Sequence, residues 1–303
     1  MVDISIRIGR LKLNNPVMVA SGTFGYGEEL SQLIDLSKLG AVVTKTITLN
    51  PSRGNPMPRT IESASGLLNS IGLENQGIDH FLKNKIPFLD KVRTKVFVSI
   101  AGESAKEFKK LTGILDKERA VDGIELNISC PNIKGKTRLI AQDPKATFKV
   151  VKAVRNTTKK AVITKLSPNV TDIVKIAQAA EGAGADALSL INTVYGMSID
   201  VETRRPNLAS VFGGLSGPAI KPIALYMVYQ VAQRVKLPLI GIGGIMTTDD
   251  ALEFIIAGAT AVAVGTGNYI NPKASIEIID GIKKYLMKNK IKKLKILMGS
   301  LKR

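Results

Sequence analysis

The chain has 303 residues, of which 45% are hydrophobic and 22% charged, a composition typical of a soluble globular protein. No apolar run approaches the ~20 residues of a membrane span, and the N-terminal residues alternate like a strand and lack a signal-peptide profile. These features favour a cytoplasmic protein with no membrane partner. The net charge of +18 can reflect either a nucleic-acid partner or a lysine-rich solvated surface.

Short apolar runs alternate with helical stretches along the whole chain. The segments Ile4–Ile8 and Leu11–Leu13 predict a β-hairpin. The predicted strands that follow it are Val17–Ser21, Ala41–Lys45, Val96–Ala101, Gly123–Asn127, Ala161–Leu166, Ala187–Ile191, Leu239–Ile242 and Ala261–Val264. The predicted helices cover residues 28–36, 77–91, 104–117, 144–157, 171–182, 218–235, 248–257 and 272–288.

This alternation predicts an α/β fold with a parallel sheet, and the count of strands is that of a (β/α)8 TIM barrel. Such a barrel typically needs about 250 residues. No Pro- or Ser-rich linker divides the chain, so we predict one domain over residues 1–303. The connections Thr46–Asn75 and Asn192–Gly217 are long, which is typical of lids or binding loops.

The charge excess is concentrated at the end of the chain. After Asp280 there is no acid, and lysines alternate with apolar residues such as Leu286 and Leu294. The pattern predicts an amphipathic helix. Few aromatic residues accompany it, so a surface helix is favoured over an RNA-binding or membrane tail, and no nucleic-acid partner is expected.

Polar residues and glycines gather at the predicted strand ends, where barrel enzymes place their active sites. These ends carry Ser21, Lys45, Ser99, Asn127 with Cys130, Lys165, Asn192 with Thr193, Gly243-Gly244 and Gly265-Thr266-Gly267. So many polar ends together predict a ligand site at that face of the barrel.

The glycines of the last two strand ends predict a phosphate site. Glycine has no Cβ and lets an anion approach the backbone N–H groups, and barrels commonly bind phosphate between these two loops. Ordinary tight turns are the alternative.

Two lysines at strand ends, Lys45 and Lys165, point to an anionic ligand, because a buried ammonium group is costly without a counter-charge. A reduced flavin, which carries negative charge near N1, is one such ligand. A salt bridge to a strand-end acid such as Glu125 is the alternative.

Cys130 is the only cysteine, so it cannot form an internal disulfide or, alone, a thiolate metal site, and no metal is predicted. It is either an inert packed thiol or a reactive one, and its polar, cationic loop favours thiolate chemistry. The only histidine, His80, is expected to be structural.

Carboxamides form a second group of candidate ligand residues. Asn69, Asn127, Asn132 and Asn192 each offer a donor and an acceptor. Together they suit a planar, amide-like substrate such as a pyrimidine ring, although each alone is more often a turn residue.

Five motifs taken together resemble the dihydroorotate dehydrogenase family, over about residues 4–279. They are Asn69-Ser70-Ile71-Gly72-Leu73, Asn127-Ile128-Ser129-Cys130-Pro131-Asn132, Lys165-Leu166-Ser167-Pro168-Asn169, Gly213-Gly214-Leu215-Ser216-Gly217-Pro218 and Gly241-Ile242-Gly243-Gly244-Ile245. The catalytic subunits of the NAD-dependent class 1B are the most similar.

The resemblance implies an FMN-containing barrel that oxidises (S)-dihydroorotate to orotate in pyrimidine synthesis, with Cys130 as the base that removes the C5 proton. It implies substrate contacts from Lys45, Asn69, Ser70, Ile71, Gly72, Leu73, Asn127, Asn132, Asn192 and Thr193. It implies FMN contacts from Ser21, Lys45, Thr46, Ser99, Asn127, Lys165, Ile191, Gly217, Gly243, Gly244, Gly265 and Thr266.

The electron acceptor depends on the subclass. The chain lacks a G-x-G-x-x-G dinucleotide motif, and one cysteine cannot ligate an iron–sulfur cluster, which needs about four. The class 1B resemblance therefore implies a homodimer of this chain bound to a separate subunit with FAD and a [2Fe-2S] cluster, as a heterotetramer.

Three alternatives remain open. Many class 1B chains have asparagine where this chain has Ser99, whereas serine is familiar in the fumarate-linked class 1A. A tRNA dihydrouridine synthase also combines FMN with a catalytic cysteine, and the basic C-terminus would suit it. A phosphate-binding scaffold without activity leaves Cys130 and both lysines unexplained.

Overall fold

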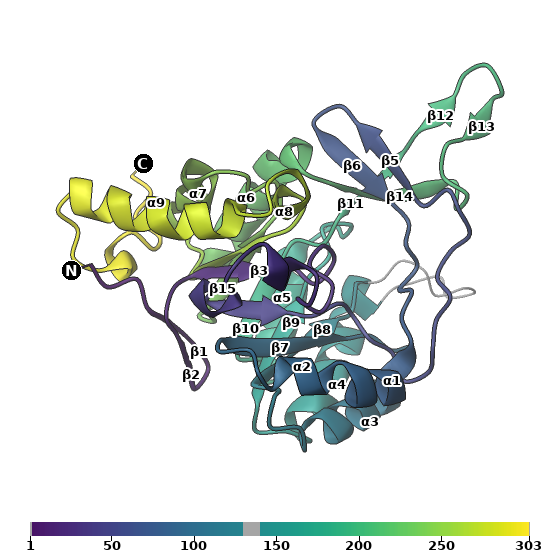
Figure 1. Ribbon diagram of the computed structural model, residues 1–303, viewed down its shortest axis with the longest axis horizontal. Helices are drawn as coiled ribbons and strands as arrows, with labels where there is room; N and C mark the ends of the chain where they lie inside the picture. Colours follow the sequence, from purple (N-terminus) through teal and green to yellow (C-terminus); the bar gives the residue numbers. More distant parts are fainter. Residues whose placement is uncertain (1, 130–139, 303) are drawn as a thin grey trace.

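The computed structural model describes residues 2–129 and 140–302, and within them a closed barrel of parallel strands confirms the predicted (β/α)8 fold. The barrel strands are β3 (Val17–Val19), β4 (Ala41–Val43), β7 (Lys95–Ile100), β8 (Gly123–Asn127), β9 (Ala161–Lys165), β10 (Ala187–Leu190), β15 (Leu239–Ile242) and β16 (Ala261–Val264). They are hydrogen-bonded in this order, and β16 closes the barrel onto β3 (Figure 1).

The barrel strands are short apolar runs because both of their faces are buried. β16 reads Ala-Val-Ala-Val, and all four residues are buried. β8 and β9 pair in register over five residues, which brings Asn127 opposite Lys165 at the carboxyl end of the two strands. The polar residues predicted at neighbouring strand ends therefore meet at one face.

Helices connect the strands around the barrel (Figure 1). They are α1 (Gly77–Asn84), α2 (Ile86–Leu89), α3 (Ala105–Leu115), α4 (Pro144–Arg155), α5 (Ile173–Gly182), α6 (Lys221–Ala232), α7 (Thr248–Ala257), α8 (Gly267–Ile270) and α9 (Ala274–Lys288). Side chains that accept backbone N–H bonds fix several of their starts, for example Ser104 before α3 and Asp172 before α5. No helix in the described ranges is long and apolar enough to cross a membrane.

The helix predicted over residues 28–36 is wrong. Two short 3-10 helices occupy this connection, η1 (Leu30–Gln32) and η2 (Leu36–Lys38). The Ser31 hydroxyl donates to the Glu28 carbonyl, and the Asp35 carboxylate accepts from the backbone N–H of Ser37. Such local side-chain bonds compete with continuous α-helix.

The amphipathic pattern at the C-terminus does not form one continuous helix. α9 ends at Lys288, Lys290 has a φ of +56°, and the short η5 (Leu294–Ile296) follows. Leu294 is fully buried, and its N–H donates to the carbonyl of Asp3. The chain after α9 thus packs against the N-terminal segment and does not continue as a helix.

A four-stranded antiparallel sheet, which the sequence did not predict, is built from the two long connections. Its order is β11 (Val194–Met197), β14 (Phe212–Ser216), β6 (Gly66–Asn69) and β5 (Thr60–Ser63). The pair β12 (Ile199–Asp200) and β13 (Arg205–Pro206) forms a separate two-stranded sheet between β11 and β14 in the chain, and Figure 1 shows it projecting beyond the barrel. At the other end of the chain, β1 (Ile6–Ile8) and β2 (Leu11–Leu13) form the predicted hairpin.

An ion pair braces the loop that follows β15. The Lys221 ammonium at the start of α6 lies 2.7 Å from Asp250 Oδ1 in α7. The other oxygen, Oδ2, accepts from the backbone N–H groups of Met246 and Thr247, each at 2.9 Å. Burial alone would raise the pKa of Asp250, but the hydrogen bonds from Lys221, Met246 and Thr247 outweigh it and lower that pKa.

We expect Asp250→Asn to lower the free energy of unfolding by about 1–2 kcal/mol at pH 7, since the charge that strengthens its hydrogen bonds to Lys221, Met246 and Thr247 is lost. A carboxylate whose pKa is lowered in the folded state stabilises the fold above its ordinary pKa of 3.8 and loses that effect as the pH falls through the folded value. Urea denaturation between pH 7 and pH 3 should therefore show the two proteins converging in acid.

The matched control is Asp249→Asn, which removes the same charge from an exposed neighbour in the same helical turn. It should change stability by less than about 0.5 kcal/mol. Equal losses in the two variants would show that the bracing by Asp250 is unimportant.

Candidate active site

A cavity of about 440 Å³ lies at the carboxyl ends of the barrel strands and gathers most of the predicted site residues. Its volume is within the usual range for small-molecule sites. The predicted residues that line it are Ser21, Lys45, Thr46, Asn69, Ser70, Ile71, Gly72, Leu73, Asn127, Lys165, Ile191, Asn192, Thr193, Gly217, Gly243, Gly244, Gly265 and Thr266.

Of the predicted site residues that the structure describes, Ser99 alone does not line this cavity. Cys130 and Asn132 lie outside the described residues. Ser99 is fully buried, and its hydroxyl is 2.9 Å from that of Thr46. The Thr46 hydroxyl also accepts from the Asn127 side chain at 3.3 Å, so Ser99 supports two lining residues from behind.

The glycines around the cavity are of two kinds. Gly243 and Gly244 have φ values of +135° and +66°, and a Cβ on Gly244 would lie 2.7 Å from Lys221 Cβ, so the fold itself requires glycine there. Gly265 has neither constraint, because a Cβ there would meet only Ala20 and Thr23, at 3.7 and 4.0 Å. Since the surrounding protein would accept a Cβ at Gly265, its glycine fits a ligand that approaches the backbone.

Lys165 is a buried cation with no acidic partner within residues 2–129 and 140–302. It is 6% exposed, and its ammonium donates to the Ser21 hydroxyl at 3.3 Å. The salt bridge to Glu125 is not formed, and no other described acid pairs with Lys165. A buried ammonium group held only by a hydroxyl is costly, so this side of the cavity is suited to an anion.

Carboxamides from separate elements also meet at the site, one of them, Asn127, on the strand next to that of Lys165. The Asn192 side chain donates to the Ser129 hydroxyl at 2.6 Å, and that hydroxyl donates to Asn127 Oδ1 at 3.1 Å. Asn69 reaches the site from β6, where its side chain donates to the Gly214 carbonyl at 3.2 Å. These bonds fix the amide groups and leave other donors and acceptors for a planar polar ligand.

The segment after β6 forms the wall between the cavity and a second, smaller one. Gly72 and Leu73 both have positive φ, at +76° and +58°. Left-handed backbone is costly for leucine. The smaller cavity, of about 270 Å³, shares Gly72, Leu73 and Asn127 with the main one and is also lined by Ile128 and Ile140.

Sequence reasoning missed five polar or glycine residues of the lining, which are Gly22, Thr23, Gly25, Glu74 and Tyr269. It also assigned no ligand contact to three lining residues that stand in the quoted motifs, Gly214, Ser216 and Gly267. Gly22 and Thr23 directly follow Ser21, so the strand-end argument extends to them. Ser216 accepts a 2.8 Å bond from the Thr266 hydroxyl. Burial raises the pKa of Tyr269, for which the sequence offered no signal.

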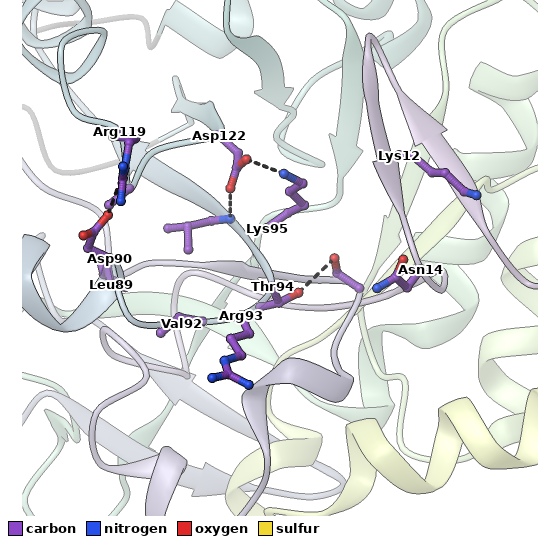
Figure 2. A pocket seen from close by; sticks show the side chains of 13 residues that line it. Lys12, Asn14, Leu89, Asp90, Val92, Arg93, Thr94, Lys95, Arg119 and Asp122 are labelled. Carbon is purple, nitrogen blue, oxygen red and sulfur yellow. Dashed lines mark hydrogen bonds and ion pairs between the residues drawn. The ribbon is translucent and has the colours of Figure 1, made fainter.

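Another cavity, of about 370 Å³, lies at the opposite end of the barrel (Figure 2). There Lys95 pairs with Asp122 at 2.7 Å, and Arg119 lies 3.8 Å from Asp90. Lys95 begins β7 and Asp122 precedes β8, so this cavity lies at the amino ends of the strands. Residues at that end of a barrel usually contribute to stability and not to catalysis. None of the predicted site residues lines this cavity.

The fold and the site define a (β/α)8 barrel protein with a cation-lined, amide-rich cavity at the carboxyl end of its strands. The profile of the dihydroorotate dehydrogenase family matches residues 4–286 of the chain. The chain therefore belongs to the dihydroorotate dehydrogenase family.

Similar proteins share almost the whole length of the chain. The relative from Trichlorobacter lovleyi is 56% identical, with 98% of each chain covered. Those from Geotalea uraniireducens and Thermoanaerobacter pseudethanolicus are 54% and 52% identical, and each match covers 99% of this chain and 98% or 99% of the relative. All three carry the name dihydroorotate dehydrogenase B (NAD(+)), catalytic subunit.

The family resemblance implies FMN in this cavity, so we expect Gly265→Val to fold but to purify without colour, because its side chain would occupy the space through which a phosphate would reach the backbone. Gly265→Ala should weaken FMN binding by about tenfold or more, which corresponds to about 1.4 kcal/mol. Absorbance of the purified protein and titration with added FMN measure both effects.

The matched control is Gly113→Ala in α3, where a Cβ would have only one neighbour, at 3.6 Å from Thr157. This variant should keep its full flavin content. A Gly265→Val protein with a full complement of FMN would place the phosphate elsewhere.

Proposed function

We propose that this chain oxidises (S)-dihydroorotate to orotate with bound FMN, as the catalytic subunit of an NAD-dependent dihydroorotate dehydrogenase of class 1B. The observation that carries the proposal is one cavity in which carboxamides, a glycine suited to a ligand, and two lysines with no acidic partner among the described residues meet. Family membership and the names of the relatives support it, and they favour it over a dihydrouridine synthase or a scaffold.

The cofactor side of the site fits FMN. Lys165 offers a buried positive charge, and Gly265 leaves its backbone open to a phosphate. The residues that would hold FMN are Ser21, Lys45, Thr46, Asn127, Lys165, Ile191, Gly217, Gly243, Gly244, Gly265 and Thr266, with Ser99 supporting Thr46. When bound, FMN supplies the acceptor for the hydride from C6 of the substrate.

The amide side of the site fits the substrate. Asn69, Asn127 and Asn192 would bind the ring amides of dihydroorotate, and Thr193 is held beside them by a 3.0 Å bond from the Asn169 side chain to its carbonyl. Ser70, Ile71, Gly72 and Leu73 would place backbone groups at the carboxylate, where Lys45 supplies a positive charge. Asn132 would complete this set.

Cys130 is the proposed base. A thiol has an ordinary pKa of about 8.5, close enough to neutrality for a thiolate to accept the C5 proton. Ser129, its neighbour in the sequence, lies within hydrogen-bond distance of Asn192, one of the proposed substrate ligands. Proton removal and hydride transfer would then occur on adjacent carbons of one bound ring.

We further propose that electrons leave through a second subunit. The phrase "catalytic subunit" in the relatives' name implies a separate partner. This chain has one cysteine and no G-x-G-x-x-G motif. A partner with FAD and a [2Fe-2S] cluster, bound to a homodimer of this chain in a heterotetramer, would provide both missing functions.

Cys130→Ala should keep its FMN and lose about 10²–10⁴-fold in the rate of flavin reduction by dihydroorotate, the usual contribution of a general base. Stopped-flow absorbance at pH 7 measures this rate. Cys130→Ser, the conservative variant, should recover part of the lost rate as the pH rises, because a hydroxyl is harder to deprotonate. Near-normal reduction by the alanine variant would exclude Cys130 as the base.

The purified chain should reduce an artificial dye with dihydroorotate but show little reduction of NAD. Added iron–sulfur flavoprotein partner should restore NAD reduction, since it supplies the dinucleotide site. Initial rates with dye, NAD and fumarate as separate acceptors test this. Rapid turnover with fumarate by the chain alone would instead assign it to class 1A.

A further inference from the structure

Glu125 is a buried acid that the proposed reaction does not use. It lies in β8 and is 2% exposed. Among the described residues it is the only buried acidic residue. Its Oε2 accepts a 3.1 Å bond from the Ser189 hydroxyl. Its Oε1 is fully buried and has no hydrogen-bond partner within residues 2–129 and 140–302.

The strand register places this carboxyl directly beneath the cavity. Residues two apart in a strand share a face and lie about 6.5–7 Å apart, so Glu125 is one layer below Asn127, which lines the cavity. In the strand register, Lys165 of β9 lies next to Asn127 of β8 on one side and next to Ser189 of β10 on the other. Because Glu125 bonds to Ser189, its carboxyl lies at the level of the strand position that bears Lys165.

A polar group this deep needs a reason, because burial without full hydrogen bonding is costly. Packing does not supply one, since an apolar residue of similar volume would fill the same space without leaving an oxygen unpaired. The buried ammonium of Lys165 gives a reason for an acid at this position. Opposite charges in a protein interior stabilise each other even without direct contact, at an effective dielectric constant of about 20.

We propose that Glu125 is a positioning residue whose negative charge offsets Lys165 and thereby weakens the binding of reduced FMN relative to oxidised FMN. This inference rests on the proposed function. Lys165 alone would favour the more negative, reduced cofactor. A fixed negative charge beneath the cavity opposes that preference, so that the reduced cofactor is not over-stabilised and electrons pass readily to the next acceptor.

Glu125→Gln tests the proposal, because it keeps the shape and removes the charge. The ratio of affinities for reduced and oxidised FMN should rise about tenfold, which is about +30 mV for a two-electron couple. Reductive titration of the purified flavoprotein against a reference dye measures the potential without any turnover. A change below twofold in that ratio would overturn the proposal.

Two matched variants separate charge from packing. Ser189→Ala removes the hydrogen bond but keeps the charge, and its ratio should change by less than threefold. Thr164→Val removes another buried oxygen without a partner, on the opposite face of β9 from Lys165, and should change nothing. A Thr164→Val shift as large as that of Glu125→Gln would show that the effect is packing.

The test remains decisive if Glu125→Gln does not fold. The infrared spectrum of the wild-type flavoprotein at pH 7 should show no protonated carboxyl band, and such a band from this buried acid would overturn the proposal. If the wild-type chain binds no FMN at all, the proposed function fails. If it binds FMN and Glu125→Gln leaves the potential unchanged, only this inference fails.

Discussion

The parallel register of β8, β9 and β10 is the constraint on which the site depends. It sets Asn127 opposite Lys165 and Lys165 opposite Ser189, so that an amide, a cation and a hydroxyl lie side by side. A slip of one residue would turn each of these side chains toward the surrounding helices. Barrel closure prevents such a slip, because every strand is paired on both edges and its apolar residues are buried on both faces.

The cavity is built from two kinds of segment. The lysine and the glycine loops come from β9, β15 and β16, where short connections hold the backbone close to the barrel. The amides and the 70–73 segment come largely from the two long connections, which meet in the sheet of β11, β14, β6 and β5. A rigid anion site and an added wall for a second ligand are thus built from different parts of the chain.

The sequence was most informative where burial dictates residue type. Apolar runs such as Ala261–Val264 located the barrel strands, and polar residues directly after them located the cavity. The antiparallel sheet was not predictable, because Asn69 and Gly214 are 145 residues apart and β6 contains no alternating pattern that would select its partner. The helix predicted over 28–36 failed for a local reason, the backbone bonds made by Ser31 and Asp35.

Residue type alone could not separate contact from support. Ser99 and Lys165 both follow from strand-end reasoning, yet Ser99 lies behind Thr46, whereas Lys165 lines the cavity. The same distinction applies to the glycines. Gly244 is required by its backbone conformation and by close neighbours, whereas a Cβ at Gly265 would meet no close contact. The decisive quantity in each case is what surrounds the residue. A buried polar group or an unfilled Cβ position that the fold leaves unsatisfied is the feature that points to a ligand.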